Sequence, residues 1–372
     1  MSRFIQALAL FIGSIIGVGV FALPFVFSEA GFLLGSIELL VLTVAVIAIS
    51  LMYGDVILAV QGSHQLPGYA KMILGKKWVR LGSIISTFNL LGALVVYVIL
   101  GTKFLGLLIS QFFPAQAEVA ALLFYFTLGL FVFFYDSAVA TEIDSALATL
   151  LLIFMAVLII LGLTHADFNF IAKINLSNIL TPYGPILFAL TGVSVIPRVA
   201  RTLGRNKTHL KQVLIIGTII PAIVYFLFVL SIIGASPHGV SRDAISGLAA
   251  TFGSGVVMLG ALVGFLSTST AYCGVGLSFR GLLQFDFGLP KRSAWLLAAV
   301  APFLLYGIGI SDFVRVVSFI GSFTIAAEGI FIVYLWKRLR HVSIIPKHYD
   351  SILSDALIGL FVFGLMYGLI LK

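Results

Sequence analysis

The first apolar stretch of the chain, residues 4–32, is interrupted near its middle by Gly13, Ser14, Gly17 and Gly19. A membrane helix keeps its backbone hydrogen bonds because hydrocarbon offers no other partner, and a glycine-dense centre is where such a helix can open. The freed N–H and C=O groups can then bind a small polar ligand. Gly13 and Gly17 also form a G-x-x-x-G pair, which can serve only the close packing of two helices. This stretch by itself therefore supports both interpretations.

A second apolar stretch, residues 182–200, is interrupted by Gly192 and Pro197. A proline inside a helix removes one hydrogen bond and disturbs the preceding turn. Five apolar stretches run from 5 to 163 and five more from 182 to 336, so both interruptions fall in the first stretch of a set. Interrupted spans at corresponding positions of two halves point to the binding site of a secondary transporter, although kinks from proline alone are common in membrane helices.

The composition is that of a polytopic α-helical membrane protein. The 372 residues are 61% hydrophobic and 10% charged, with a mean hydropathy of +1.18, whereas soluble domains carry about 25% charged residues. A β-barrel would show short alternating segments, but the apolar runs here are continuous and close to membrane-spanning length. We expect eleven spans, near residues 5–28, 33–60, 81–109, 117–135, 143–163, 182–200, 212–234, 253–279, 293–311, 313–336 and 352–371.

The net charge of +8 does not indicate nucleic acid, because the basic residues lie in short loops between apolar runs. Cationic loops stay on the cytoplasmic side, and their distribution predicts a cytoplasmic N-terminus and an external C-terminus in the cytoplasmic membrane. The single cysteine, Cys273, lies within an apolar run, so the chain has no internal disulfide. We expect three segments: a first five-span repeat (1–163), a second, inverted repeat (164–336), and a loop with an eleventh span (337–372).

Five segments resemble, in order, the motifs of one superfamily. They are GSIIGVGVFALPFVFSEAG (Gly13–Gly31), LPGYAKMILGKK (Leu66–Lys77), FALTGVSVIPRVART (Phe188–Thr202), LKQVLIIGTIIPAIVYFLFVLSIIG (Leu210–Gly234) and TAYCGVGLSFRGLLQFDFGLPK (Thr270–Lys291). The chain resembles the amino acid–polyamine–organocation superfamily, and within it the hydroxy/aromatic amino acid permeases and the amino acid/auxin permeases.

The resemblance implies the leucine-transporter fold, a five-plus-five inverted repeat with discontinuous first and sixth spans, here with an eleventh span. It also implies symport of amino acids, aromatic or hydroxylated, by alternating access with a proton or sodium ion. No catalytic residue and no cofactor beyond the coupling ion is expected. Related permeases often read Thr-Ser where this chain has Thr270-Ala271.

An amino acid substrate has a carboxylate that needs donors and an ammonium that needs acceptors. We expect N–H groups of the opened first span to meet the carboxylate at the positive end of a half-helix. Carbonyls of the first and sixth spans would accept from the ammonium, and side chains of the third and sixth spans would line the pocket. The predicted substrate-binding residues are Ser14, Ile15, Ile16, Gly17, Val18, Gly19, Asn89, Tyr97, Phe188, Thr191, Gly192 and Ser194.

Two groups of residues are candidates for the coupling ion. Thr268, Ser269 and Thr270 form a hydroxyl cluster in the eighth span, where this fold commonly places a sodium site against the first span, and hard cations suit such oxygens. The alternative is that the hydroxyls bond to the preceding helical turn. Glu38 and Glu328 are acidic residues inside spans and could carry a proton, or form a polar bond to a neighbouring span.

Other classes of protein fit less well. The chain has no H-E-x-x-H, G-x-S-x-G or G-x-x-x-x-G-K-[ST] motif, so an enzyme is not expected. A carrier of divalent metals would need acidic, Asn or Met ligands at the two interruptions, which instead hold Gly, Ser and Thr. A non-transporting amino acid sensor could use the same pocket, as could a transporter of another small substrate on the same fold. The expected partners are a small amino acid and membrane lipid, not nucleic acid.

Overall fold

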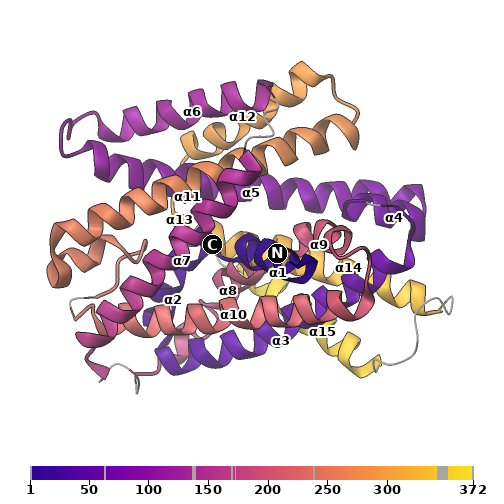
Figure 1. Ribbon diagram of the computed structural model, residues 1–372, viewed down its shortest axis with the longest axis horizontal. Coiled ribbons are helices and arrows are strands. Elements are labelled where there is room, and N and C mark those ends of the chain that lie inside the picture. The colour runs from indigo at the N-terminus through magenta and orange to yellow at the C-terminus, as the bar shows by residue number, and fades with distance from the viewer. Residues whose placement is uncertain are drawn as a thin grey trace.

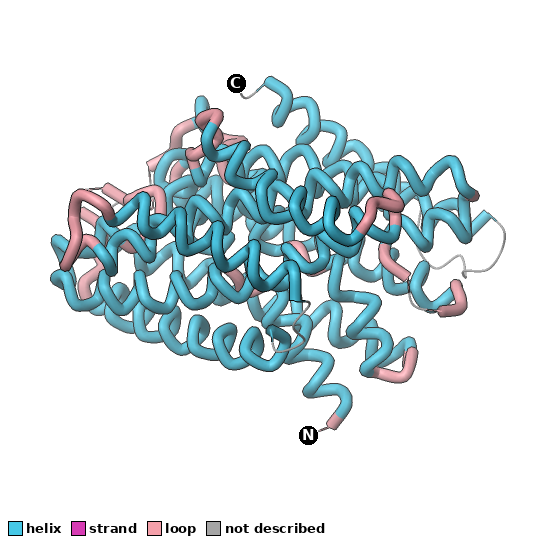
Figure 2. Tube along the Cα trace, turned by 90° about the horizontal axis from the view of Figure 1, so that it is seen from above, coloured by secondary structure: helices cyan, strands magenta, loops and turns pink. Residues whose placement is uncertain are grey.

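The computed structural model describes residues 2–62, 64–135, 140–168, 171, 173–237, 239–341 and 351–370. The regular structure in these ranges is helical throughout (Figure 2). The elements are α1 (Arg3–Ile15), η1 (Val18–Ala22), α2 (Leu23–Ala30), α3 (Phe32–Ala59), α4 (Leu66–Leu74), α5 (Lys76–Ile109), α6 (Ala117–Tyr135), α7 (Ala140–Thr164), η3 (Leu176–Asn178), α8 (Tyr183–Leu190), η4 (Val193–Val195), α9 (Ile196–Thr202), α10 (Lys207–Gly234), η5 (Ser246–Leu248), α11 (Ala249–Phe285), α12 (Lys291–Gly307), α13 (Phe313–Phe319), η6 (Ile320–Ile325), α14 (Ala326–His341) and α15 (Ser351–Ile370).

The interrupted spans lie in the middle of the bundle. In Figure 1, α1, α8 and α9 are surrounded by the longer helices, with α5, α11, α6 and α12 on one side and α3 and α10 on the other. The contacts agree with this view, because α1 packs against α10, α9 and α7, and α8 packs against α3, α13 and η6. The helices that carry the interruptions are therefore the core of the molecule rather than part of its rim.

The described helices account for the expected spans. Among the described residues, nine stretches are long and apolar enough to cross a membrane. The other two expected spans correspond to α7, whose apolar described part is Thr149–Thr164, and to α12, which has 17 residues. The predicted segment 337–372, a cytoplasmic loop with the eleventh span, includes residues 342–350, which lie outside the described residues.

The first span opens where the sequence predicts. Ser2 caps the start of α1 by accepting from the N–H of Ile5, and the helix ends at Ile15. Ile16 and Gly17 are extended, and the chain resumes as the short 3-10 helix η1 before Pro24 sets the first turn of α2. A glycine-rich segment loses little side-chain packing in this extended conformation, so the sequence makes the opening inexpensive here.

The sixth span opens in the same manner. The helix α8 ends at Leu190, Thr191 is extended, and η4 and α9 follow, with Pro197 in the first turn of α9. A proline at a first helical position needs no N–H partner, so Pro197 starts a helix rather than breaking one. The proline was expected to disturb the middle of a span, whereas its place is the start of the second half.

A buried aspartate in the loop between α10 and α11 forms an ion pair with α5. Asp243 in this loop is 1% exposed and pairs with Lys103 of α5 at 2.7 Å. Burial acts to raise the pKa of Asp243, but the charge and hydrogen bond of Lys103, with hydrogen bonds from Ser246 and Ser241, hold the pKa below its usual value. The loop is thereby fixed to α5.

At another edge of the bundle, a single arginine ties α3 to the turn after α9. Arg205 donates to the backbone carbonyls of Ile57, Leu58, Val60 and Gly62, at 2.6–3.1 Å. These carbonyls come at the end of α3, where the helix leaves its last acceptors without partners. Arg205 therefore caps the end of α3.

Candidate functional site

The two interruptions lie against each other in the middle of the bundle. A Cβ built on Gly19 would lie 2.9 Å from Phe188 Cδ1 and 3.0 Å from the Cα of Ala189, just before the sixth-span interruption. A Cβ built on Gly192 would lie 2.9 Å from Ile15 Cγ1, just before the first-span interruption. Each of these glycines therefore permits a close approach to the residues that end the other half-helix.

One tyrosine hydroxyl joins the two helix ends. Tyr225 of α10, fully buried, donates toward the carbonyl oxygens of Ile15 at 2.8 Å and Ala189 at 3.2 Å. Both carbonyls belong to the last turns of helices that stop at an interruption, where intrahelical donors are missing. Tyr225 thus provides one hydrogen-bond donor for carbonyls of both α1 and α8. It links the ends of these two helices to each other through α10.

The second halves of both spans begin without a capping side chain. The N-cap of η1 is Gly17 and that of η4 is Gly192, so neither start has a capping side chain of its own, although the backbone N–H of Gly17 reaches the Tyr225 hydroxyl. The first N–H groups of a helix have no intrahelical partner and carry partial positive charge. Two such ends therefore lie close to two carbonyl ends, an arrangement that suits a small zwitterion with a carboxylate and an ammonium.

The first interruption has unfilled space beside it. A Cβ on Gly17 would have the carbonyl oxygen of Ile15, at 4.0 Å, as its nearest neighbour. Gly17 is half-buried, as are Ser14 and Thr191, while Ile16 and Gly192 are buried. A ligand can therefore reach the backbone from the Gly17 side without displacing a packed side chain.

Several predicted binding groups are at this junction, but not all of them are available. The N–H of Ile16 completes the last turn of α1 by donating to Ile12 O at 2.8 Å, so it is not a free donor. The hydroxyl of Ser14 donates to Phe11 O at 2.7 Å within the same helix. Phe188 is half-buried beside Gly19, in a position to form an aromatic wall. Val18 is buried in η1, and Ser194 is exposed in η4.

The two predicted residues of the third span lie on α5. Tyr97 is half-buried and packs against both hydrophobic clusters of the protein. Asn89, predicted to bind substrate, donates from Nδ2 to Glu328 Oε2 at 3.1 Å. Glu328 is 6% exposed on α14. The structure thus brings together one predicted substrate residue and one predicted ion residue, and it pairs them with each other rather than with the interrupted helices.

The hydroxyl cluster of the eighth span is hydrogen-bonded to α6 and to carbonyls of its own helix, α11. Thr268 and Ser269 each lie 2.9 Å from the hydroxyl of Tyr125 on α6. Thr268 also donates to Gly264 O at 2.8 Å, and Thr270 donates to Ser267 O at 3.1 Å, within their own helix. Hydroxyls that donate keep oxygen lone pairs for a hard cation, so these bonds do not test the predicted sodium site.

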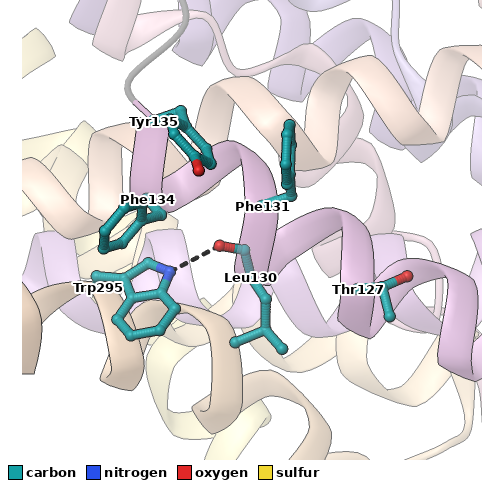
Figure 3. A pocket seen from close by; sticks show the side chains of 6 residues that line it. All are labelled: Thr127, Leu130, Phe131, Phe134, Tyr135 and Trp295. Atoms are coloured by element: carbon teal, nitrogen blue, oxygen red, sulfur yellow. Dashed lines mark hydrogen bonds between the residues drawn. The ribbon is translucent and has the colours of Figure 1, made fainter.

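One surface groove lies away from the interruptions. It holds 420 Å³ between α6 and α12 and is lined by Thr127, Leu130, Phe131, Phe134, Tyr135 and Trp295 (Figure 3). Trp295 donates from Nε1 to the carbonyl of Leu130 at 2.9 Å. The rings of Phe131 and Tyr135 are largely exposed, so the groove opens to the outside of the bundle. Its apolar lining suits a lipid chain better than a zwitterion.

Comparison with known families decides the identity of the chain. The sequence model of the tryptophan/tyrosine permease family matches residues 1–341. The chain belongs to this family. The predicted superfamily and its hydroxy/aromatic branch are confirmed, and the permease is a transport protein rather than an enzyme. A search of curated protein sequences finds no match.

Solved structures confirm the fold of the permease. The inward-facing conformation of Mhp1 is similar over 99% of this chain and 89% of that chain, with a TM-score of 0.64 and 14% identity. A closed conformation of Mhp1, a nucleobase-cation-symport-1 family transporter with bromovinylhydantoin bound, covers 98% of this chain and 90% of that one, with a TM-score of 0.66 and 13% identity. The predicted leucine-transporter type of fold is confirmed, while the repeat bounds 1–163 and 164–336 stay a prediction.

Sequence reasoning missed Tyr225 as a member of the site. The residue was noted only as part of a motif in the seventh span, where it follows Pro221 by one helical turn. A tyrosine inside an otherwise apolar span is a signal, because its hydroxyl needs a polar partner when it is buried. The sequence does not show that this partner is the pair of interrupted helices.

Proposed function

We propose that this permease imports aromatic amino acids across the cytoplasmic membrane by alternating access, coupled to a proton or a sodium ion. The family membership supports a secondary transporter, and the name of the family points to tryptophan and tyrosine. The observation that carries the substrate class is the junction of the interrupted helices, where uncapped N–H ends lie beside carbonyl ends. Such an arrangement complements the two charges of an amino acid.

The Gly17 side of the junction supports a bulky substrate. The unfilled space there leaves the backbone of the first span accessible to a ligand. Phe188, on α8, is half-buried. An aromatic ring on Phe188 can pack edge-to-face or offset against an aromatic substrate. We propose that the amino acid carboxylate binds the N–H groups at the start of η1 and that its side chain lies toward Phe188. The expected orientation, with the N-terminus in the cytoplasm, belongs to this proposal.

The test is uptake by the purified permease in proteoliposomes. Labelled tryptophan, tyrosine, serine and threonine are supplied under an inward proton gradient and, separately, an inward sodium gradient. We expect accumulation of tryptophan or tyrosine above that of serine and threonine. Equal uptake of all four would contradict the aromatic class. Binding of tryptophan without uptake under either gradient would identify a sensor, and the absence of both binding and uptake would overturn the substrate assignment.

A further inference from the structure

A buried carboxylate in α3 is without a hydrogen-bond partner in the described part of the chain. Both carboxylate oxygens of Glu38 are inaccessible to solvent, and no described donor reaches either of them. None of the ion pairs among the described residues includes this side chain. Glu328, the other acidic residue in the middle of a span, differs because Asn89 donates to it. Glu38 is therefore the carboxylate that the packing leaves unsatisfied.

Two tyrosines face Glu38 from neighbouring helices. Tyr183, at the start of α8, and Tyr367, on α15, both interact electrostatically with it. The hydroxyl of Tyr183 donates to Leu360 O at 3.1 Å, and Tyr367 is hydrogen-bonded to Thr181. The Tyr183 hydroxyl is thus occupied by the carbonyl of Leu360, while the Tyr367 oxygen accepts from Thr181, and neither hydroxyl is hydrogen-bonded to Glu38.

The remaining helices packed against α3 supply no counter-charge. On α9, Arg198 and Arg201 are exposed, and neither forms an ion pair with Glu38 among the described residues. On α2, Glu29 is exposed and lies beside Asn178, and on α10 the Tyr225 hydroxyl is directed to the helix interruptions. On α14, Glu328 is paired with Asn89. Lys207 lies 3.9 Å from Asp55, about 25 Å along α3 from Glu38. Among the described residues, no lysine, arginine or histidine offsets the charge of Glu38.

A carboxylate in these surroundings is stable only as the neutral acid. Removing an ionised carboxylate from water without a partner is strongly unfavourable, and ionisable groups inside membrane spans are retained where they bind or carry ions. We propose that Glu38 holds a proton in this conformation and is the group that couples proton movement to transport. This inference rests on the proposed transport function and names its coupling ion as the proton.

The position of Glu38 connects it to the substrate site through α8. Tyr183 begins α8, and the same short helix ends at the interruption near Gly192. A Cβ on Gly364 of α15 would lie 2.2 Å from the Tyr183 hydroxyl, and one on Gly184 would lie 2.2 Å from Ser318 O. The helix α8 is therefore packed without free space against α15 and the tenth span. Ionisation of Glu38 would require this packing to open, which moves the half-helix that forms the substrate site.

The experiment compares two activities of the full-length permease in proteoliposomes. Exchange of labelled tryptophan against internal tryptophan needs no gradient, whereas accumulation of tryptophan under an inward proton gradient needs coupling. With one proton per substrate, a gradient of about one pH unit supports about tenfold accumulation. We expect Glu38→Gln to retain exchange within about twofold. The variant should lose the tenfold accumulation, because the pH gradient is its whole driving force and an amide cannot carry the proton. Glu29→Gln, an exposed carboxylate on α2, is the matched control and should retain both activities.

The outcomes separate this inference from the proposed function. If the unaltered permease neither exchanges nor accumulates tryptophan or tyrosine, the proposed function fails. If it accumulates tryptophan with a proton gradient and Glu38→Gln does so equally, or if only a sodium gradient drives accumulation, the role of Glu38 is overturned. Should Glu38→Gln fail to fold, proton exchange is measured on the unaltered permease with a pH-sensitive dye. Tryptophan binding that neither takes up nor releases a proton overturns the inference without any variant.

Discussion

The two interruptions share a design but differ in what fills the space beside them. Gly192 in the sixth span is buried against Phe11 and Ile15, and a methyl group there would overlap both. Gly17 in the first span is half-buried, and a methyl group there would have no neighbour closer than 4.0 Å. The second interruption is a packed joint, whereas the first presents its backbone to open space.

This difference assigns separate roles to residues of the same type. A glycine that allows close packing contributes to stability, and its replacement strains the core. A glycine beside open space contributes nothing to packing, so its value lies in what comes near it. The comparison predicts that changes at the packed joint act on folding and that changes at the open position act on binding.

The largest effect is expected where the two interruptions are held together. Tyr225→Phe removes the hydroxyl that the carbonyls of Ile15 and Ala189 share. Leaving buried acceptors unsatisfied costs about 1–3 kcal/mol for each group. We expect a large fall in thermal stability in detergent, together with weaker tryptophan binding.

Tyr272→Phe provides the matched control for this change. The hydroxyl of Tyr272 is also buried, and it has no partner among the described residues. Its removal should therefore leave the free energy of unfolding nearly unchanged or slightly improved. Equal losses in the two variants would show that Tyr225 does not stabilise the junction.

A single added methyl group at the packed joint should lower the stability of the protein. Gly192→Ala places a methyl group 2.9 Å from Ile15 Cγ1 and from Phe11 Cε2. Overpacking of a core of this kind typically costs about 1–3 kcal/mol. Thermal unfolding of the purified variant measures the loss. An unchanged melting temperature would show that the joint has room, and the contrast between the two interruptions would then be lost.

The sequence predicted the interruptions more fully than it predicted their partners. Glycine in an apolar run and Pro197 mark where hydrogen bonds are missing, and this is a local property of the chain. The pairing of Asn89 with Glu328 and the contact of Thr268 with Tyr125 join residues far apart in the sequence. Such contacts depend on which helix faces are adjacent, and in a span that is apolar on all sides periodicity does not reveal the face.

The sequence also did not show which individual backbone N–H groups are free to bind a ligand. Ile16 was expected to offer its N–H to a ligand because it precedes Gly17 in the interrupted segment. The structure shows that α1 retains its hydrogen bond from Ile16 to Ile12, so the opening starts one residue later. Helix ends are uncertain by one or two residues when they are inferred from composition, and here that uncertainty decides which group is free.

The open position gives the prediction with the smallest effect on stability and a specific effect on function. Gly17 has an extended conformation with φ −141°, which any residue can adopt. Gly17→Ala should therefore change the free energy of unfolding by less than about 0.5 kcal/mol. If substrate occupies the space beside Gly17, the methyl group displaces it, and we expect tryptophan affinity to fall about tenfold, equivalent to about 1.4 kcal/mol. Unchanged affinity, with Gly17→Val also unaffected, would place the substrate elsewhere.

The loop between α10 and α11 contacts the first interrupted span. Arg242, next to Asp243, lies over the ring of Phe25 on α2 at 5.7 Å, beyond the first interruption. Asp243 fixes this loop through Lys103, whose side chain is 43% exposed, so solvent weakens the pair. We expect Asp243→Asn to cost about 1 kcal/mol and to loosen the second half of the first span without affecting the sixth.

The pH dependence of this loop has a definite sign. The pKa of Asp243 is lower in the folded permease than in an unfolded chain, where it is about 3.9. Its contribution to stability is therefore complete above the unfolded value and is lost as the pH falls through the lower, folded value. Thermal unfolding measured from neutral to strongly acidic pH should show an acid loss that is smaller in Asp243→Asn. If both proteins lose stability equally in acid, the ionised Asp243 does not fix the loop, and the first span is held over its open position by packing alone.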